Sequence, residues 1–258
     1  MKKIYLYGNW KMNMTCEETK EYFTKMSSAL KESTISESLG AELEIAIFPP
    51  FTSIATAMEK KSRVIVGAQN VYFENKGAFT GEVSIPMLLE LGCTHVLVGH
   101  SERRQVFKES NELLAKKLKA ALDAKLIPVY CYGETLEEQE SGKKYDVIRE
   151  QLHKGIGKLT KEEIDRIIFA YEPVWAIGTG KSATPQEAEE ACKHSRYLIY
   201  GFLNSVRRIT MLYGGSVKSE NARELLSMPN IDGVLVGGAS LKVDSFLDIF
   251  RAYKRLIN

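Results

Sequence analysis

Ile167-Ile168-Phe169-Ala170-Tyr171-Glu172-Pro173 contains both features that decide the fold, a short apolar run and a polar group where the run ends. The run does not alternate polar and apolar residues, which is typical of a strand covered on both faces in a parallel sheet. Proline disfavours the helical conformation of the residue before it, so Glu172 should stay extended. The segment therefore predicts a buried parallel strand with a carboxylate at its carboxyl end.

Apolar runs of this kind occur eight times, and helical patterns separate them as in repeated βαβ units. We expect strands at Ile4–Gly8, Glu44–Phe48, Val64–Gln69, His95–Gly99, Leu126–Tyr130, Ile167–Tyr171, Ile209–Tyr213 and Gly233–Val236. The chain has 258 residues, close to the roughly 250 of a (β/α)8 barrel, and no linker divides it. We predict an α/β fold with a single barrel domain of eight parallel strands over residues 1–258. An open doubly wound sheet has the same alternation and is the alternative.

Helix signals agree with this alternation. In a capping box, a Thr and a Glu three residues later bond each other's backbone N–H groups. Three segments fit that pattern: Thr15–Glu18, Thr135–Glu138 and Thr184–Glu187. Two apolar stripes have the spacing of helices that pack on a sheet: Leu114, Leu118, Ala121 and Leu122, and Phe246, Ile249, Phe250 and Tyr253.

Composition excludes several classes of function. The formal charge is only +2, from 35 Lys and Arg against 33 Asp and Glu, so no nucleic-acid partner is expected and an anionic ligand must be held locally. The four cysteines are far apart without a C-x-x-C pair, which predicts neither a metal site nor a disulfide framework. No apolar run approaches a membrane span, and Gly8, Asn9 and Lys11 interrupt the first one too early for a signal peptide. We therefore expect a cytoplasmic protein without membrane partners.

Polar residues follow five of the eight runs, and the carboxyl ends of barrel strands carry the active site. The segments are Asn9-Trp10-Lys11, His100-Ser101-Glu102, Glu172-Pro173, Gly214-Gly215-Ser216 and Gly237-Gly238. Glycine lets backbone N–H groups approach an anion, and helix N-termini add partial positive charge. Ser216, Gly237 and Gly238 therefore suggest a phosphate cradle.

The remaining groups form a chemical set. Glu172 would act as a base, and His100, at the start of a helix, would donate a hydrogen bond to a carbonyl oxygen. Lys11 would face a developing oxyanion, with Glu102 orienting it and an extended backbone placing Asn9 on the same face. Taken singly, each has a structural explanation: a solvated carboxylate, a buried histidine and a surface lysine. Together they suit proton transfer next to a carbonyl.

Gly180-Lys181-Ser182 looks like the end of a P-loop, but Trp175 stands where that motif requires its first glycine. A P-loop phosphotransferase is therefore disfavoured. The surrounding segment, from Pro173 to Ala183, is better interpreted as an apolar lid that closes over a ligand and excludes water.

Five segments together resemble the triosephosphate isomerase family. They are Gly8–Asn13, Val98–Arg104, Ala170–Gly180, Tyr213–Ser216 and Gly237–Ser240, and they run in order through nearly the whole chain. The resemblance implies a TIM barrel that interconverts dihydroxyacetone phosphate and D-glyceraldehyde 3-phosphate in glycolysis and gluconeogenesis, without metal or cofactor. It assigns catalysis to Glu172, His100 and Lys11, and substrate binding to Asn9, Lys11, Gly178, Ser216, Gly237 and Gly238.

The family resemblance also implies a homodimer. The loop from Gln69 to Glu82 is similar to one that docks into a second subunit, and its aromatic residues favour an interface over an exposed loop. Tyr132 and Met14 depart from the residues usual in the family, which affects core packing and the dimer edge. Two alternatives remain: a non-catalytic phosphosugar-binding barrel, and a barrel aldolase or epimerase. The latter needs a Schiff-base lysine or metal ligands, and neither is evident in the sequence.

Overall fold

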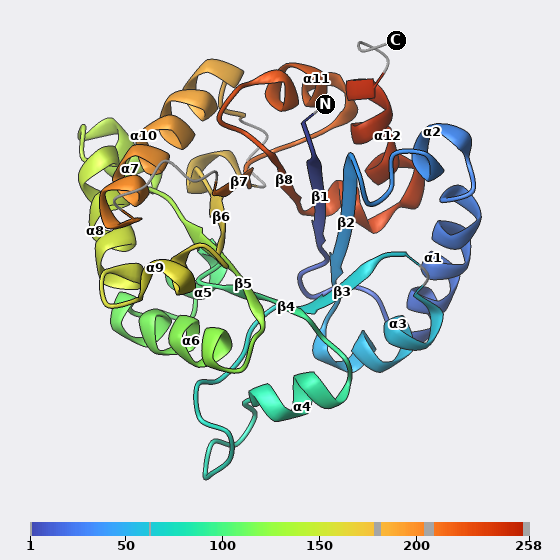
Figure 1. The fold of residues 1–258 in the computed structure, drawn as a ribbon, viewed down its shortest axis with the longest axis horizontal. Helices are drawn as coiled ribbons and strands as arrows, with labels where there is room; N and C mark the ends of the chain where they lie inside the picture. The colour runs from blue at the N-terminus through green and yellow to red at the C-terminus, as the bar shows by residue number, and fades with distance from the viewer. Residues whose placement is uncertain (1, 62, 178–181, 204–208, 255–258) are drawn as a thin grey trace.

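Eight parallel strands close into a barrel in the computed structural model, which describes residues 2–61, 63–177, 182–203 and 209–254 (Figure 1). The strands are β1 (Ile4–Asn9), β2 (Leu43–Phe48), β3 (Ile65–Ala68), β4 (His95–Val98), β5 (Ile127–Tyr132), β6 (Ile168–Tyr171), β7 (Thr210–Tyr213) and β8 (Gly233–Val236). Each strand pairs with the next along the chain, and β8 pairs with β1. The predicted (β/α)8 fold is confirmed, and the open sheet is excluded.

The carboxyl ends of four strands differ from the prediction by one or two residues: β1 and β5 are longer, and β3 and β4 are shorter. β5 continues to Tyr132 because Cys131 and Tyr132 pair with Ala170 and Tyr171 of β6. β3 ends at Ala68, one residue before the predicted end, and the side chain of Gln69 instead donates hydrogen bonds to carbonyl groups near the ends of β1 and β2.

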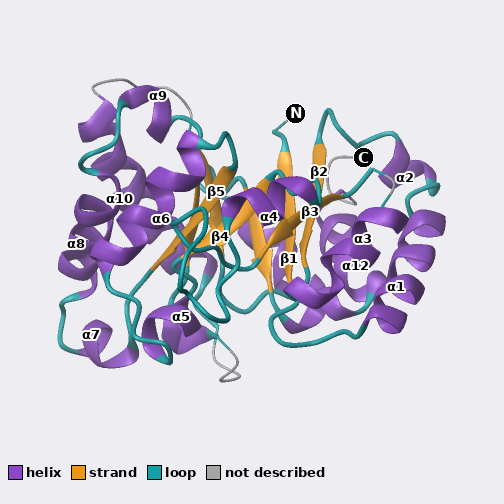
Figure 2. Cartoon of the chain, turned by 90° about the horizontal axis from the view of Figure 1, so that it is seen from below, coloured by secondary structure: helices purple, strands orange, loops and turns teal. Residues whose placement is uncertain are grey.

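The helices lie outside the strands, as Figure 2 shows. They are α1 (Cys16–Ala29), α2 (Ser33–Ser36), α3 (Ile54–Lys60), α4 (Ile85–Glu90), α5 (Ser101–Gln105), α6 (Asn111–Asp123), α7 (Leu136–Glu140), α8 (Lys144–Ile156), α9 (Lys161–Ile164), α10 (Pro185–Leu203), α11 (Ser219–Ser227) and α12 (Val243–Lys254). Short 3-10 helices are η1 (Phe51–Ser53), η2 (Val174–Ala176) and η3 (Gly238–Leu241). None of the helices in the described part of the chain combines the length and apolar character that crossing a membrane requires.

All three predicted capping boxes are present. Thr15 and Glu18 open α1, Thr135 and Glu138 open α7, and Thr184 and Glu187 exchange the same two backbone hydrogen bonds before α10. A fourth box, Thr160 with Glu163, opens the short helix α9 and was missed because that helix has only four residues and no apolar stripe. Each cap is worth about 1 kcal/mol of helix stability.

Two apolar layers form the core. Inside the barrel, Tyr7, Phe48, Leu97 and Leu212 are completely or almost completely buried. Between barrel and helices, both predicted stripes are buried, on α6 and α12. Full burial of such side chains stabilises the fold by about 1.5–3 kcal/mol each. The strands that carry the candidate site residues are therefore packed on both faces.

The cysteines are free thiols: Cys16 is exposed, and the other three are buried. Within the residues that the structure describes, no group of three or more His, Cys, Asp or Glu side chains is arranged to hold a metal ion.

Candidate active site

Glu172 follows β6 and is 1% exposed. Its backbone N–H donates to the carbonyl of Tyr132 at 2.7 Å, which extends the β5–β6 ladder by one residue. Its Oε2 accepts a hydrogen bond from the backbone N–H of Ser101, also at 2.7 Å. Oε1 is buried and has no hydrogen-bond partner among the described residues, although Nε2 of His100 lies 3.4 Å away. A buried carboxylate oxygen without a hydrogen-bond partner can accept a proton from a bound molecule.

His100 is the N-cap residue of α5 and is 6% exposed. Its Nδ1 accepts a hydrogen bond from the backbone N–H of Glu102 at 3.3 Å. A ring nitrogen that accepts carries no proton, so the proton of the neutral ring lies on Nε2, the nitrogen nearest Glu172. The imidazole can therefore act as a donor toward a molecule placed beside Glu172.

Lys11 lies beyond β1 with φ of 54°, so the expected extended backbone between Asn9 and Lys11 is wrong. Oδ1 of Asn9 accepts the Lys11 backbone N–H at 3.0 Å, and Nε2 of Gln69 donates to the Lys11 carbonyl at 2.8 Å. These two bonds hold the left-handed turn. The Lys11 ammonium lies 2.7 Å from Oε1 of Glu102, which confirms the predicted partner.

A cavity of about 230 Å³ opens at the carboxyl ends of β1, β7 and β8. Its lining includes the predicted residues Asn9, Lys11, His100, Ser216, Gly237 and Gly238. A Cβ on Gly237 would lie 3.4 Å from Cε of Lys11, whereas one on Gly238 would meet no atom within 4 Å. The glycine segment thus leaves backbone open to a ligand beside the ammonium. Glu172 forms no part of this lining; its carboxylate lies behind His100, against Ser101.

The predicted lid is described only at its two ends. Residues 178–181 lie outside the described residues, and with them the predicted phosphate ligand Gly178. At the end of the lid that follows β6, Nε1 of Trp175 donates to Oε1 of Glu134 at 2.9 Å, and the Tyr171 hydroxyl donates to the same carboxylate. Burial raises the pKa of the Glu134 carboxyl, and these hydrogen bonds oppose the shift.

Sequence reasoning missed the residues that support this site. Ser101 holds the carboxylate through its backbone, which no side-chain pattern reveals. Arg104 donates to the carbonyl groups of Gly99 and Cys131 at 2.8 and 2.9 Å, and so joins the ends of β4 and β5. An arginine in the first turns of a helix carries no signal for such a contact. Its proximity to the His100 segment was the only available hint.

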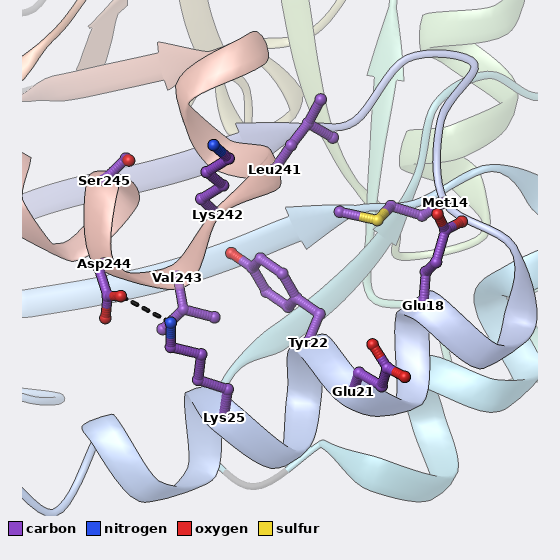
Figure 3. Close-up of a pocket in the computed structure, with 10 residues that line it drawn as sticks. All are labelled: Met14, Glu18, Glu21, Tyr22, Lys25, Leu241, Lys242, Val243, Asp244 and Ser245. Atoms are coloured by element: carbon purple, nitrogen blue, oxygen red, sulfur yellow. Dashed lines mark hydrogen bonds and ion pairs between the residues drawn. The ribbon is translucent and has the colours of Figure 1, made fainter.

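A second cavity, of about 370 Å³, lies between α1 and the start of α12 (Figure 3). An ion pair of 2.6 Å joins Lys25 to Asp244 at its edge, and Tyr22 extends from α1 toward the α12 segment. Met14 lines this cavity and has φ of 76°, a conformation that favours glycine. Glu172, His100 and Lys11 do not line it.

The loop from Gln69 to Glu82 projects beyond the ring of helices between β3 and α4 (Figure 1). The ring of Tyr72 packs against Phe73 and Phe79, with centroids 4.5 Å apart in both pairs. Phe79 is 40% exposed, so apolar surface remains at the tip of the loop.

Fold and site define this chain as a (β/α)8-barrel enzyme with an imidazole, an ammonium and a buried carboxylate at or beside a glycine-lined cavity. A sequence model of the triosephosphate isomerase family matches residues 4–253. The chain is 44% identical to the triosephosphate isomerase of Dictyoglomus turgidum, covering 98% of this chain and 100% of that protein. It is also 44% identical to that of Carboxydothermus hydrogenoformans and 43% to that of Fusobacterium nucleatum, each covering at least 97% of this chain and 99% of the relative. The chain belongs to the triosephosphate isomerase family, which confirms the resemblance.

Proposed function

We propose that this chain interconverts dihydroxyacetone phosphate and D-glyceraldehyde 3-phosphate through an enediolate. The observation that carries the proposal is the convergence of Lys11, His100 and Glu172, remote in sequence, at one end of the barrel. The Lys11 and His100 side chains line one cavity, and the Glu172 carboxylate lies 3.4 Å from the His100 ring. The names of the relatives support the same reaction.

In the proposed reaction, Glu172 removes a proton from the carbon next to the carbonyl. Nε2–H of His100 and the Lys11 ammonium stabilise the oxygen that becomes negative. The proton then returns to the neighbouring carbon, while the proton of the adjacent hydroxyl group passes through Nε2 of His100 to the former carbonyl oxygen, so that the carbonyl and hydroxyl groups exchange places. The carboxylate is bound to the Ser101 N–H and does not line the cavity. The proposed reaction therefore requires the Glu172 side chain to turn toward the cavity before it removes the proton. Acid–base groups contribute typically about 10²–10⁴-fold, and fixed donors at the oxyanion add about 10²–10³-fold each.

We assign the phosphate of the substrate to the glycine-rich wall of the cavity. Ser216, Gly237 and Gly238 line it. The family resemblance adds Gly178, which lies outside the described residues. Asn9 contributes its amide while holding the turn of Lys11. The overall charge of +2 supports local recognition of this kind, because no general attraction for anions is present.

A coupled assay tests the proposed function. Purified protein with a chelator and no added cofactor should convert each triose phosphate into the other. No conversion would contradict the proposal and favour an aldolase or epimerase of the same fold, whereas conversion only after metal is added would contradict a reaction that needs no metal.

We further propose a homodimer formed through the loop from Gln69 to Glu82, with residues 1–258 of each subunit forming one domain. The exposed ring of Phe79 supports this interface, because association would remove its apolar surface from water. Sedimentation should give twice the mass of the chain, and Phe79→Asp should shift the equilibrium toward monomer. A monomeric wild-type protein at micromolar concentration would contradict the proposed dimer.

The proposed activity places the chain in glycolysis and gluconeogenesis, in the cytoplasm, without nucleic-acid or membrane partners. Fractionation of cells that produce the protein, with immunodetection in each fraction, tests this location.

A further inference from the structure

The backbone of Glu172 rests against Gly133, the residue that follows β5. A Cβ on Gly133 would lie 1.9 Å from the carbonyl oxygen of Glu172, so only glycine permits this contact. Hydrogen bonds flank it on both sides. The Tyr132 carbonyl accepts the Glu172 N–H at 2.7 Å, and the Glu134 carbonyl accepts the Val174 N–H at 3.0 Å. The position of Gly133 therefore sets the position of the Glu172 backbone.

One side chain on the outside of the barrel holds Gly133. The Gly133 N–H donates to Oε1 of Gln151 at 2.8 Å, and Nε2 of Gln151 donates to the Gly133 carbonyl at 3.0 Å. A single amide thus binds both polar backbone groups of one residue. Only an amide has a donor and an acceptor side by side at neutral pH, so no other side chain of this length can make both bonds.

Gln151 is itself anchored. Its backbone carbonyl accepts a hydrogen bond from the Tyr130 hydroxyl at 2.7 Å, and Nη2 of Arg104 donates to that hydroxyl at 3.2 Å. Arg104 also donates to the carbonyl of Gly99, directly before His100. One continuous set of contacts therefore reaches from the His100 segment, through α8, to the backbone behind Glu172.

We propose that Gln151 is a positioning residue for the proton-transfer step and acts on Glu172 through Gly133. The inference rests on the proposed isomerase function, because it assigns Glu172 as the base. Gln151 is not one of the residues that line the cavity, so its loss should affect proton transfer and leave substrate binding unchanged. A misplacement of about 1 Å at a reacting group can cost 10²-fold in rate.

Gln151→Met tests the inference, because methionine has a similar length and can make neither hydrogen bond. We expect kcat to fall about tenfold, with KM and the inhibition constant of inorganic phosphate unchanged. The matched control is Gln186→Met, the same substitution at an exposed position in the first turn of α10. The control should retain the wild-type kcat.

Gln151→Glu adds a signature that a purely structural role would not produce. An ionised carboxylate can accept the Gly133 N–H but repels the Gly133 carbonyl, whereas a protonated carboxyl can make both bonds. The ratio of variant to wild-type kcat should therefore rise as the pH is lowered. Gln186→Glu should show a constant ratio.

Three results would overturn the inference: an unchanged kcat in both Gln151 variants, a parallel worsening of KM and phosphate inhibition, or a loss of kcat that thermal unfolding fully explains. Failure of both variants to fold would show that the contact is structural. Absence of isomerisation by the wild-type protein is a separate outcome, because it removes the proposed function itself.

Discussion

At the amino-terminal end of the barrel, Oε1 of Glu44 accepts a hydrogen bond from the Tyr7 hydroxyl at 2.6 Å, and Oε2 accepts one from Lys3 at 2.8 Å. At the carboxyl end, Glu172 has one oxygen bonded to Ser101 and the other without a hydrogen bond in the described structure. Both residues are glutamates at strand ends. A carboxylate with both oxygens occupied stabilises the fold, whereas one with a free oxygen has capacity for a substrate proton.

The two ends of the barrel also differ in their histidines, because His95 begins β4 and His100 follows its carboxyl end. His95 is 5% exposed inside the barrel, where Nδ1 lies 2.8 Å from the Thr94 hydroxyl, and its ring packs edge-on against Tyr7. His100 lines the cavity at the carboxyl end, and its Nε2 lies 3.4 Å from Oε1 of Glu172. The amino-terminal end also has a cavity, of about 660 Å³, so the presence of a hollow does not by itself distinguish the two ends. The hydrogen-bond partners of Glu44 and Glu172 distinguish the two ends.

The largest expected effect comes from Glu172→Gln. The amide keeps the shape of the side chain but cannot remove a proton, so kcat should fall at least about 10³-fold. Stability should not fall, because the substitution removes a buried charge. Steady-state kinetics together with thermal unfolding check both statements. Retention of more than a tenth of wild-type turnover would remove Glu172 as the base.

Lys11→Met should lower kcat/KM by about 10²-fold, because a fixed cation toward the developing oxyanion is lost. Glu102 then loses its 2.7 Å partner but remains partly solvated, so the cost in stability should be small. Kinetics at several salt concentrations measure the effect. An equal loss in a Lys25→Met control, which removes a lysine of the second cavity, would show that the effect is not local.

At the amino-terminal end, His95 should affect stability and not turnover. Burial lowers the pKa of His95 to about 4, and Glu44 partly opposes the shift. Between pH 4 and the ordinary value of about 6.5, the unfolded chain binds a proton that the folded chain does not. The stability from neutral His95 is therefore complete above about pH 6.5 and lost as the pH falls toward 4.

His95→Phe should remove about 2 kcal/mol of the difference in unfolding free energy between pH 7 and pH 4.5. Urea unfolding of wild type and variant at both pH values measures this change. An identical pH dependence in the two proteins would refute it, and a large loss of kcat would place His95 in the catalytic machinery.

The smallest expected effect is that of Tyr7→Phe. The substitution removes the hydrogen bond to Glu44 and leaves the buried ring in place, so the unfolding free energy should decrease by about 1 kcal/mol. Turnover should match wild type within twofold. A stability change of zero would mean that Glu44 recovers an equivalent partner from water.

Much of the site was predictable because parallel strands place their carboxyl ends at one edge. That rule brought Lys11, His100 and Glu172 together as candidates, and it also placed Glu102, which follows another strand, where it pairs with Lys11. The rule says nothing about backbone turns, so the left-handed conformation of Lys11 was not foreseen. It also does not extend to outer helices: Gln151 occupies an ordinary polar position of an amphipathic helix, and only its contact with Gly133 distinguishes it.

Local sequence was enough to place each strand to within two residues and to locate the starts of α1, α7 and α10, because apolar spacing and caps act over three or four residues. It also determined which chemical groups the strand ends present. Closure of the sheet, the bond from the Ser101 N–H to Glu172 and the hold of Gln151 on Gly133 were decided only by the tertiary structure. Each joins segments far apart in the chain, and such contacts depend on strand register and helix packing, which no local pattern encodes.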